Sequence, residues 1–144
     1  MPPGPDRPAG RDRRRRGDGD RVRAGLGGAP LSDDCLFCRL VRGEIPADVV
    51  ARDERFVAFT DIAPKAPVHV LVVPVEHVAS IAGVEGLDEA TRAAMPVFIA
   101  GVARGLDLEG GGYRVTTNHG PDARQSVHHL HWHLMGGGTL SESM

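Results

Sequence analysis

The stretch of sequence that decides the fold is VHHLHWHLMGGG, which runs from Val127 to Gly138 and holds four of the chain's seven histidines. It is rich in apolar residues, contains no proline and ends in three glycines. These features predict a strand, whose side chains point alternately to two faces. One face would carry Val127, His129, His131 and His133, and the other, core-like face would carry His128, Leu130, Trp132 and Leu134. We therefore expect three imidazoles in a row on one side of a sheet.

Four further strands are predicted at residues 47–53, 55–61, 66–74 and 111–118. The first two are expected to form a hairpin that turns at Asp53 and Glu54. Because the connections are of hairpin length and only one long helix is predicted, the sheet is expected to be mainly antiparallel. The predicted fold class is α+β, with a five-stranded antiparallel sheet, one long helix and a short N-terminal helix.

Two helices are predicted from apolar spacing and capping residues. The short one covers residues 35–41, where Ser32 or Asp33 can cap its start and Gly43 ends it. The long one covers residues 86–108 and contains Pro96, which is expected to kink or delay it. Its apolar residues follow the helical i, i+3, i+4, i+7 pattern at Met95, Phe98, Ile99, Val102 and Leu106.

Composition divides the 144-residue chain into a tail and one domain. Residues 1–30 consist largely of Pro, Gly, Arg and Asp, so they offer almost nothing to bury and are expected to be a disordered tail. Residues 31–144 are long enough for a single domain, and this part is acidic. The four arginines at 13–16 are read as a solvated tail, which disfavours nucleic acid as a partner.

No apolar run is long enough for a secretory signal or a membrane span. We therefore expect a cytoplasmic protein without a membrane partner.

The row of histidines suits either metal binding or nucleophilic attack at phosphorus. A neutral imidazole is a nucleophile near pH 7 and can pass a proton through its second nitrogen. Histidines on a strand can also be ordinary surface residues, but three on one face favour a chemical role. His69, His119 and His128 receive the ordinary interpretation, as a strand residue, a loop residue and a residue on the opposite face.

Two other features leave alternatives open. Cys35 and Cys38 form a C-x₂-C pair, whose spacing allows a zinc knuckle, a redox pair or two inert thiols. Asp61 follows a predicted strand and precedes Pro64, so its carboxylate can bind the two hydroxyls of a ribose or cap the turn.

Three motifs together resemble the histidine triad (HIT) superfamily, and in particular its Hint branch of purine nucleoside phosphoramidases. These motifs are TDIAPKAPVHVLVVPVEHV, YRVTTNHG and QSVHHLHWHLMGG, and the likeness extends from about Asp34 to Gly138. The resemblance implies cleavage of the P–N bond of purine nucleoside 5′-phosphoramidates through a nucleotidyl-histidine intermediate. Alternatives are the hydrolysis of other nucleoside phosphates, such as dinucleoside polyphosphates, and a nucleotide-binding regulatory dimer with incidental catalysis.

The resemblance also assigns roles to individual residues. His131 would be the nucleophile, with His129 and His133 orienting it and stabilising the phosphoryl oxygens, and Ser126 contacting the phosphate or the leaving amine. Asp61 would bind the ribose. The remaining residues implied in substrate binding are Leu36, Phe37, Leu40, Phe59, Ile62, Asn118, Gln125 and Val127.

A zinc site and a homodimer are implied in the same way. The zinc ligands would be Cys35, Cys38, His77 and His129, and no organic cofactor is expected. Two copies would pair through the long helix and the adjoining strand. The chain departs from the family at Arg124, where many members carry a glycine that lets the backbone approach phosphate.

Overall fold

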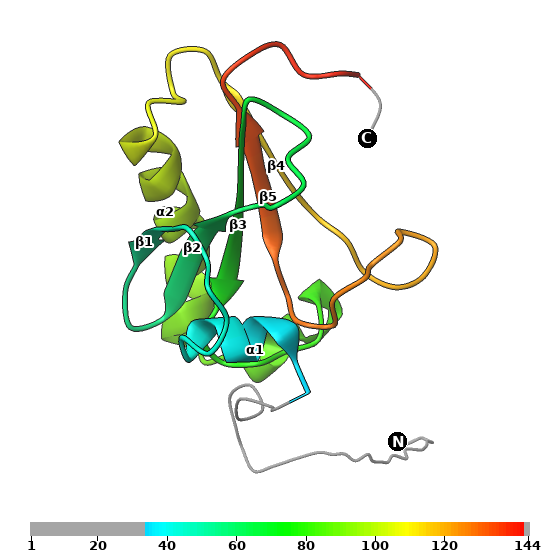
Figure 1. The fold of residues 1–144 in the computed structure, drawn as a ribbon. Helices are drawn as coiled ribbons and strands as arrows, with labels where there is room; N and C mark the ends of the chain where they lie inside the picture. The colour runs from blue at the N-terminus through cyan, green and yellow to red at the C-terminus, as the bar shows by residue number, and fades with distance from the viewer. Residues whose placement is uncertain (1–33, 143–144) are drawn as a thin grey trace.

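The computed structural model describes residues 34–142, which form an antiparallel sheet flanked by helices (Figure 1). The strands lie in the order β1-β2-β3-β5-β4, which confirms the predicted α+β class. They are β1 (Val49–Arg52), β2 (Phe56–Thr60), β3 (Val68–Pro74), β4 (Tyr113–Thr117) and β5 (Trp132–Gly136). The predicted tail over residues 1–30 and the possible cap at Ser32 or Asp33 lie outside the described residues. Within residues 34–142, none of the helices is both long and apolar enough to cross a membrane.

The hairpin between β1 and β2 turns where the sequence predicts it. One carboxylate oxygen of Asp53 accepts the backbone N–H groups of Arg55 and Phe56, each at 2.8 Å. This side chain therefore takes over the hydrogen bonds that the tight turn would otherwise leave unpaired. The pairing of β1 with β2 starts at Arg52 and Val57. In the sheet, β2 lies between β1 and β3.

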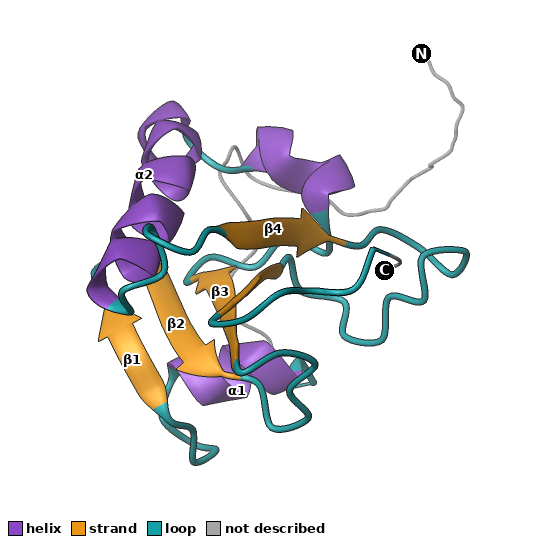
Figure 2. Ribbon diagram, turned by 90° about the horizontal axis from the view of Figure 1, so that it is seen from above, coloured by secondary structure: helices purple, strands orange, loops and turns teal. Residues whose placement is uncertain are grey.

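Two cores lie on opposite faces of the sheet, each covered by one helix (Figure 2). Helix α2 (Glu89–Gly105) packs on the face that carries Phe56, Val70 and Leu134. Helix α1 (Leu36–Val41) packs on the other face through Phe37, Leu40 and Val41, against Val57, Phe59, Leu71 and Val73. The alternation of β2 and β3 between these cores explains why both strands are apolar along their whole length.

Helix α1 is capped by one of the two cysteines. The Cys35 Sγ accepts the backbone N–H of Cys38 at 3.3 Å, and the helix begins at Leu36, one residue later than predicted. Gly43 follows its end with φ +81°, in the left-handed region that favours glycine. The cap therefore fixes the Cys35 sulfur relative to the backbone of Cys38.

Helix α2 is shorter than predicted, because Asp88 caps it. The Asp88 carboxylate accepts the backbone N–H of Thr91 at 2.7 Å, so the α-helix starts at Glu89. Pro96 lies inside the helix without ending it. A 3-10 helix, η1 (Ile81–Gly86), was not predicted, and the hydroxyl of Ser80 caps it by accepting the Ala82 N–H at 3.1 Å.

The prediction of one continuous histidine strand is wrong in its first half. Only Trp132–Gly136 form β5, so His129 and His131 precede the strand and do not lie in a ladder. The reason is that the Leu130 N–H donates to the Val78 carbonyl, in the segment that follows β3, at 2.8 Å. The predicted alternation survives, since Leu130 and Leu134 lie in the core beneath α2. The imidazoles consequently lie on the side of α1.

Candidate active site and metal centre

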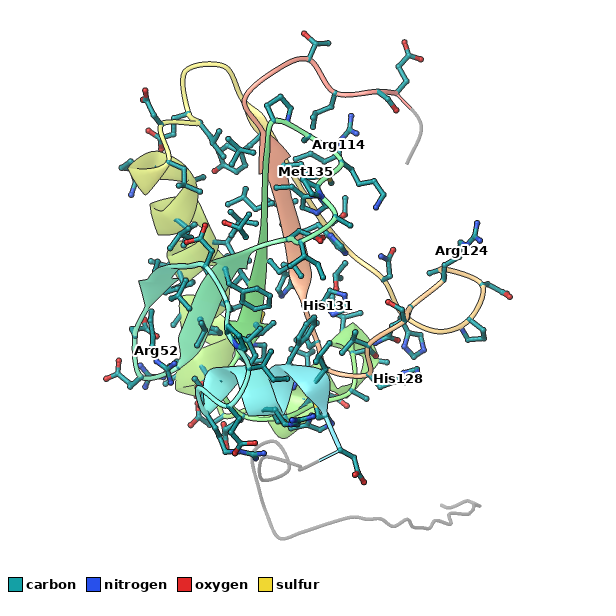
Figure 3. All side chains as sticks on the ribbon, viewed as in Figure 1. Arg52, Arg114, Arg124, His128, His131 and Met135 are labelled. Atoms are coloured by element: carbon teal, nitrogen blue, oxygen red, sulfur yellow. The ribbon has the colours of Figure 1, made fainter. Side chains whose placement is uncertain are left out.

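A cavity of about 500 Å³ lies on the α1 side of the sheet, with His131 and His133 in its wall. His131 lies close to α1 (Figure 3). Helix α1 contributes the apolar side chains of Leu36, Phe37 and Leu40 to the cavity. The side chain of Ile62, which also lines the cavity, is fully exposed, and that of Leu36 is 46% exposed. Apolar walls left open in this way suit a planar, apolar ligand group such as a nucleobase.

His131 has its ring oriented by the backbone of His129. The Nδ1 of His131 lies 2.7 Å from the His129 carbonyl oxygen, so Nδ1 carries the proton and donates it. The lone pair is then on Nε2, for which residues 34–142 supply no hydrogen-bond partner. The Phe37 ring packs edge-on against the imidazole, with centroids 5.1 Å apart. The arrangement therefore presents an unprotonated ring nitrogen at the cavity.

His133 is oriented by a chain of hydrogen bonds that starts at a backbone amide. The Lys65 N–H donates to His69 Nδ1 at 2.9 Å, which leaves the proton of His69 on Nε2. That Nε2 donates to His133 Nδ1 at 2.9 Å, so the proton of His133 is on its own Nε2. His133 thereby carries a hydrogen-bond donor on a ring whose centroid lies 5.3 Å from that of His131.

Burial keeps the imidazoles of His133 and His69 neutral. It lowers the pKa of His133 to about 4, an effect that the neighbouring rings of His131 and His69 increase and Asp61 opposes. Burial likewise lowers the pKa of His69, against the attraction of Asp61. Neutral rings have one donor and one acceptor each, so the hydrogen-bond chain is well defined near pH 7.

Asp61 caps the turn, which is one of the two interpretations that the sequence left open, and it also lies in the cavity wall. One carboxylate oxygen accepts the Ala63 N–H at 2.8 Å, which is the turn cap. The other lies 3.4 Å from His69 Nε2, and the residue also lines the cavity. Each oxygen has a second lone pair, so the cap does not exclude a ligand hydroxyl.

The loop before the histidines is held by Gln125. Its side-chain oxygen accepts the Gly120 N–H at 3.0 Å, and its Nε2 donates to the carbonyls of Ala79 and Val127 at 2.8 and 3.1 Å. The side-chain amide thus braces the loop instead of facing the cavity. Ser126, the next residue, lines the cavity and is exposed.

Arg124 occupies a left-handed backbone conformation in this loop, with φ +63°. Such a conformation costs a non-glycine residue about 1–2 kcal/mol. We expect Arg124→Gly to raise the free energy of unfolding by about 1 kcal/mol in urea denaturation, since glycine relieves the strain but gains entropy when unfolded. Asp107, at φ +62°, provides the matched control, because aspartate tolerates this region and Asp107→Gly should gain less. Equal or lower stability of Arg124→Gly would contradict the strain argument.

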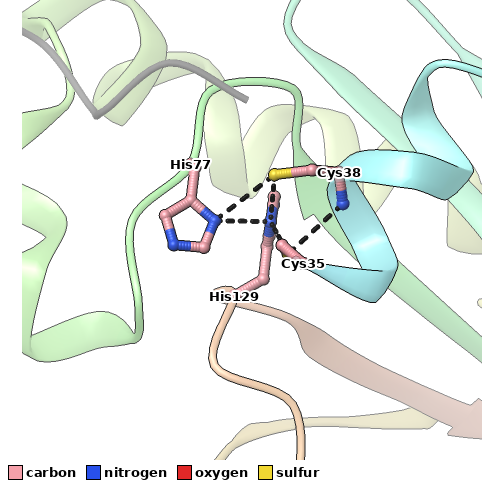
Figure 4. A group of neighbouring side chains, drawn as sticks. All are labelled: Cys35, Cys38, His77 and His129. Carbon is pink, nitrogen blue, oxygen red and sulfur yellow. Dashed lines mark hydrogen bonds between the residues drawn. The ribbon is translucent and has the colours of Figure 1, made fainter. Parts of the chain in front are cut away.

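Four side chains that the sequence spreads over 95 positions meet in one cluster: Cys35, Cys38, His77 and His129 (Figure 4). The Nδ1 of His129 lies 3.3 Å from Cys35 Sγ, 3.5 Å from Cys38 Sγ and 3.1 Å from His77 Nδ1. His77 Nδ1 lies 3.4 Å from Cys38 Sγ. Helix α1 supplies the sulfurs, the segment after β3 supplies His77, and the segment before β5 supplies His129.

The cluster fits a tetrahedral metal ion. Zn–S bonds of about 2.3 Å and Zn–N bonds of about 2.0 Å imply ligand-to-ligand distances of roughly 3.3–3.8 Å, close to those observed. The Nε2 of His129 lies 2.9 Å from the Pro74 carbonyl and donates to it, so the Nδ1 lone pair faces the other three atoms. Burial lowers the pKa of His129 to about 4, despite the opposing hydrogen bond to Pro74, and also lowers that of His77. Both rings are therefore neutral, as metal ligands must be.

Ten of the predicted catalytic and substrate-binding residues line the cavity, and three do not. Those in its lining are Leu36, Phe37, Leu40, Phe59, Asp61, Ile62, Ser126, Val127, His131 and His133. Asn118, Gln125 and His129 do not line it, and His129 belongs to the metal cluster instead. The Nδ1 of His119 lies 2.7 Å from the Ser80 hydroxyl oxygen and His128 is exposed, which agrees with their ordinary interpretation.

Sequence reasoning missed His69, which is 3% exposed and hydrogen-bonded to His133. It also missed the wall residues Ile45, Pro46, Ala47, Asp48, Thr60 and Leu71. Alternation along the third strand could have placed His69 and Leu71 on one face. The sequence does not show that this face of the third strand lies beside the histidine stretch, because their contact depends on the pairing of β3 with β5.

Comparisons with known proteins show which family this chain resembles. A family model described as the HIT domain matches residues 42–140, which include the histidine stretch but not the two cysteines. An uncharacterized HIT-like protein of Synechococcus elongatus is 39% identical over 111 residues, covering 77% of this chain and 96% of that protein. A solved HIT family hydrolase from Clostridium thermocellum is 36% identical with a TM-score of 0.70, over 78% of this chain and 98% of its own. A HIT family hydrolase from Legionella pneumophila is 38% identical with a TM-score of 0.72, over 76% and 98%.

Proposed function

Because this chain belongs to the HIT family, we propose that it is a nucleotide hydrolase that cleaves purine nucleoside 5′-phosphoramidates at the P–N bond. Solved relatives that are called HIT family hydrolases support a hydrolase-type enzyme. The observation that carries the proposal is the unprotonated Nε2 of His131 at a cavity whose walls are mostly apolar but include the carboxylates of Asp48 and Asp61. A protein that only binds nucleotides needs no such nucleophile.

In the first step, Nε2 of His131 attacks the α-phosphorus and the P–N bond breaks. Positive charge develops on the imidazole, and the hydrogen bond from Nδ1 to the His129 carbonyl stabilises it. The departing nitrogen takes up a proton that we route from solvent through the exposed hydroxyl of Ser126, which donates one proton and takes up another and so stays neutral. The product is a nucleotidyl-histidine and a free amine.

In the second step, water attacks the phosphorus and the bond to His131 breaks. The proton that water loses passes to solvent through the same hydroxyl, so the enzyme returns to its initial state and the nucleoside monophosphate leaves. The hydrogen bond from His69 to Nδ1 of His133 leaves the proton of His133 on Nε2. We assign this Nε2–H as a donor to a phosphoryl oxygen in both steps. One preorganised donor of this kind is worth about 3 kcal/mol in the transition state.

The test is a steady-state assay with adenosine 5′-phosphoramidate and guanosine 5′-phosphoramidate, in which release of the monophosphate is measured. Turnover of either compound supports the proposal. Nucleotide binding without turnover would instead favour the regulatory dimer. Faster turnover of a dinucleoside polyphosphate than of both phosphoramidates would favour that substrate class.

Asp61 provides a prediction about binding alone. We expect Asp61→Ala to weaken AMP binding by about 1–3 kcal/mol, because a charge-assisted hydrogen bond to the ribose is lost. Isothermal titration of AMP checks this. The matched ligand is 2′,3′-dideoxy-AMP, whose affinity should be the same for the variant and the unaltered protein. An Asp61→Ala variant that binds AMP normally would leave only the turn-capping role.

We further propose that the Cys/His cluster holds one zinc ion. The support is its donor set of two sulfurs and two imidazoles at tetrahedral spacing. When bound, zinc would link α1 to the segments after β3 and before β5, and it would take no part in the reaction at His131.

We also propose a homodimer that forms through α2 and β4. The support is that β4 is an edge strand, and that a hollow of about 440 Å³ between it and α2 is lined by apolar residues such as Ile99, Val115 and Trp132. Light scattering at micromolar concentration should give twice the mass of the chain. A charge at the centre of the edge, Val115→Asp, should produce a monomer, and the same mass for both proteins would contradict this interface.

A further inference from the structure

The metal cluster and the nucleophile share one short piece of backbone. The ring of His129 has one nitrogen in the cluster and donates through the other to the Pro74 carbonyl. Its own carbonyl accepts the Nδ1 proton of His131 at 2.7 Å. Between them, the Leu130 N–H is anchored to the Val78 carbonyl. A cluster nitrogen and the carbonyl that orients His131 thus belong to one residue, His129.

Helix α1 forms a second connection between the cluster and the cavity. Cys35 and Cys38 lie in the cluster, whereas Leu36, Phe37 and Leu40 of the same six-residue helix line the cavity. The Phe37 ring contacts the rings of both His129 and His131, with centroids at 6.0 and 5.1 Å. A helix this short is not stable by itself, so its position depends on what holds it to the sheet.

From these two connections we propose that metal binding at the cluster and nucleotide binding in the cavity are thermodynamically coupled. Metal raises the affinity for nucleotide because it fixes the helix that forms the base-binding wall and the carbonyl that orients His131. By linkage, nucleotide must raise the affinity for metal by the same factor. This inference rests on the proposed function only in that a purine nucleotide occupies the cavity.

The experiment starts from the zinc-loaded full-length protein, so that it does not depend on a stable metal-free form. Zinc transfer to an excess of a chromogenic chelator is followed with and without saturating AMP. We expect AMP to slow zinc release and to lower the zinc dissociation constant by about tenfold, within the usual range of coupling between two sites. Inorganic phosphate, which lacks the base and ribose, should have a much smaller effect.

Two variants test whether the coupling between AMP and zinc depends on α1 or follows from any binding of AMP in the cavity. Leu40→Ala and Ile62→Ala each remove an aliphatic side chain from the cavity wall, but only Leu40 lies on α1. With AMP at saturation, Ile62→Ala should keep the delay in zinc release, and Leu40→Ala should lose most of it. Equal delays in both variants would overturn the route through α1.

The outcomes distinguish this inference from the proposed function. If AMP binds and zinc release is unchanged, the coupling is wrong while the hydrolase proposal stands. If AMP binds and the purified protein holds no zinc, the coupling is also wrong. If AMP does not bind at all, the proposed function itself fails.

Discussion

His131→Asn is expected to reduce kcat on adenosine 5′-phosphoramidate by roughly 10³–10⁶-fold, as the loss of a covalent nucleophile does in other enzymes. Asparagine is similar in size and retains a hydrogen-bonding group, but it has no nucleophilic nitrogen. The affinity for AMP should change little, because the apolar wall of α1, Asp61 and Ser126 all remain. Single-turnover kinetics and AMP titration measure the two quantities separately.

The control for this variant is the neighbouring His133. His133→Asn removes a donor beside the reacting centre and should lower kcat less than His131→Asn, because the nucleophile remains. Rapid quenching in acid-free buffer should trap a nucleotidyl-protein with His133→Asn but not with His131→Asn. Unaltered turnover by His131→Asn would show that another residue is the nucleophile, and His133 would be the next candidate.

Cys38→Ser is expected to lower zinc content from about one equivalent per chain to near zero and to destabilise the protein. Cys38 is completely buried and contacts both His77 and His129 in the cluster. The binding free energy of a structural zinc ion is folding free energy, so the loss should be on the order of several kcal/mol. Metal analysis and thermal unfolding measure the two effects.

A chelator provides the matched control for Cys38→Ser. It should lower the melting temperature of the unaltered protein toward that of the variant and leave the variant itself unchanged. Carefully purified protein without metal and with an unchanged melting temperature in chelator would rule out the zinc site. The catalytic proposal would be unaffected, since zinc takes no part in the reaction.

Local physics explains why the strands could be predicted. The apolar runs at β2 and β3, the alternation around β5 and the turn at Asp53 all depend on neighbours within a few residues. Helix ends were less accurate because each depends on a particular hydrogen bond. Cys35 competes with other polar residues for the cap of α1, and Asp88 shortens α2.

The error at the histidine stretch has a different origin. Sequence alternation correctly placed His131 and His133 on the face opposite Leu130 and Leu134. Alternation does not show where the hydrogen-bonded ladder ends, because the partner strand decides that. Here β3 ends at Pro74, whose carbonyl accepts from His129 instead of from a strand neighbour.

The sequence by itself determined the family motifs, the α+β class and the residue types that meet at the site. A row of imidazoles, a C-x₂-C pair and an Asp after a strand are chemical facts of the chain. Only the tertiary structure decided which partner each histidine ring meets. His129 turns away to the cysteines, His131 keeps a free Nε2, and His69 joins His133 from another strand. The physical reason is that the protonated nitrogen of each ring is chosen by a partner distant in sequence, and such partners are set by strand pairing and helix packing.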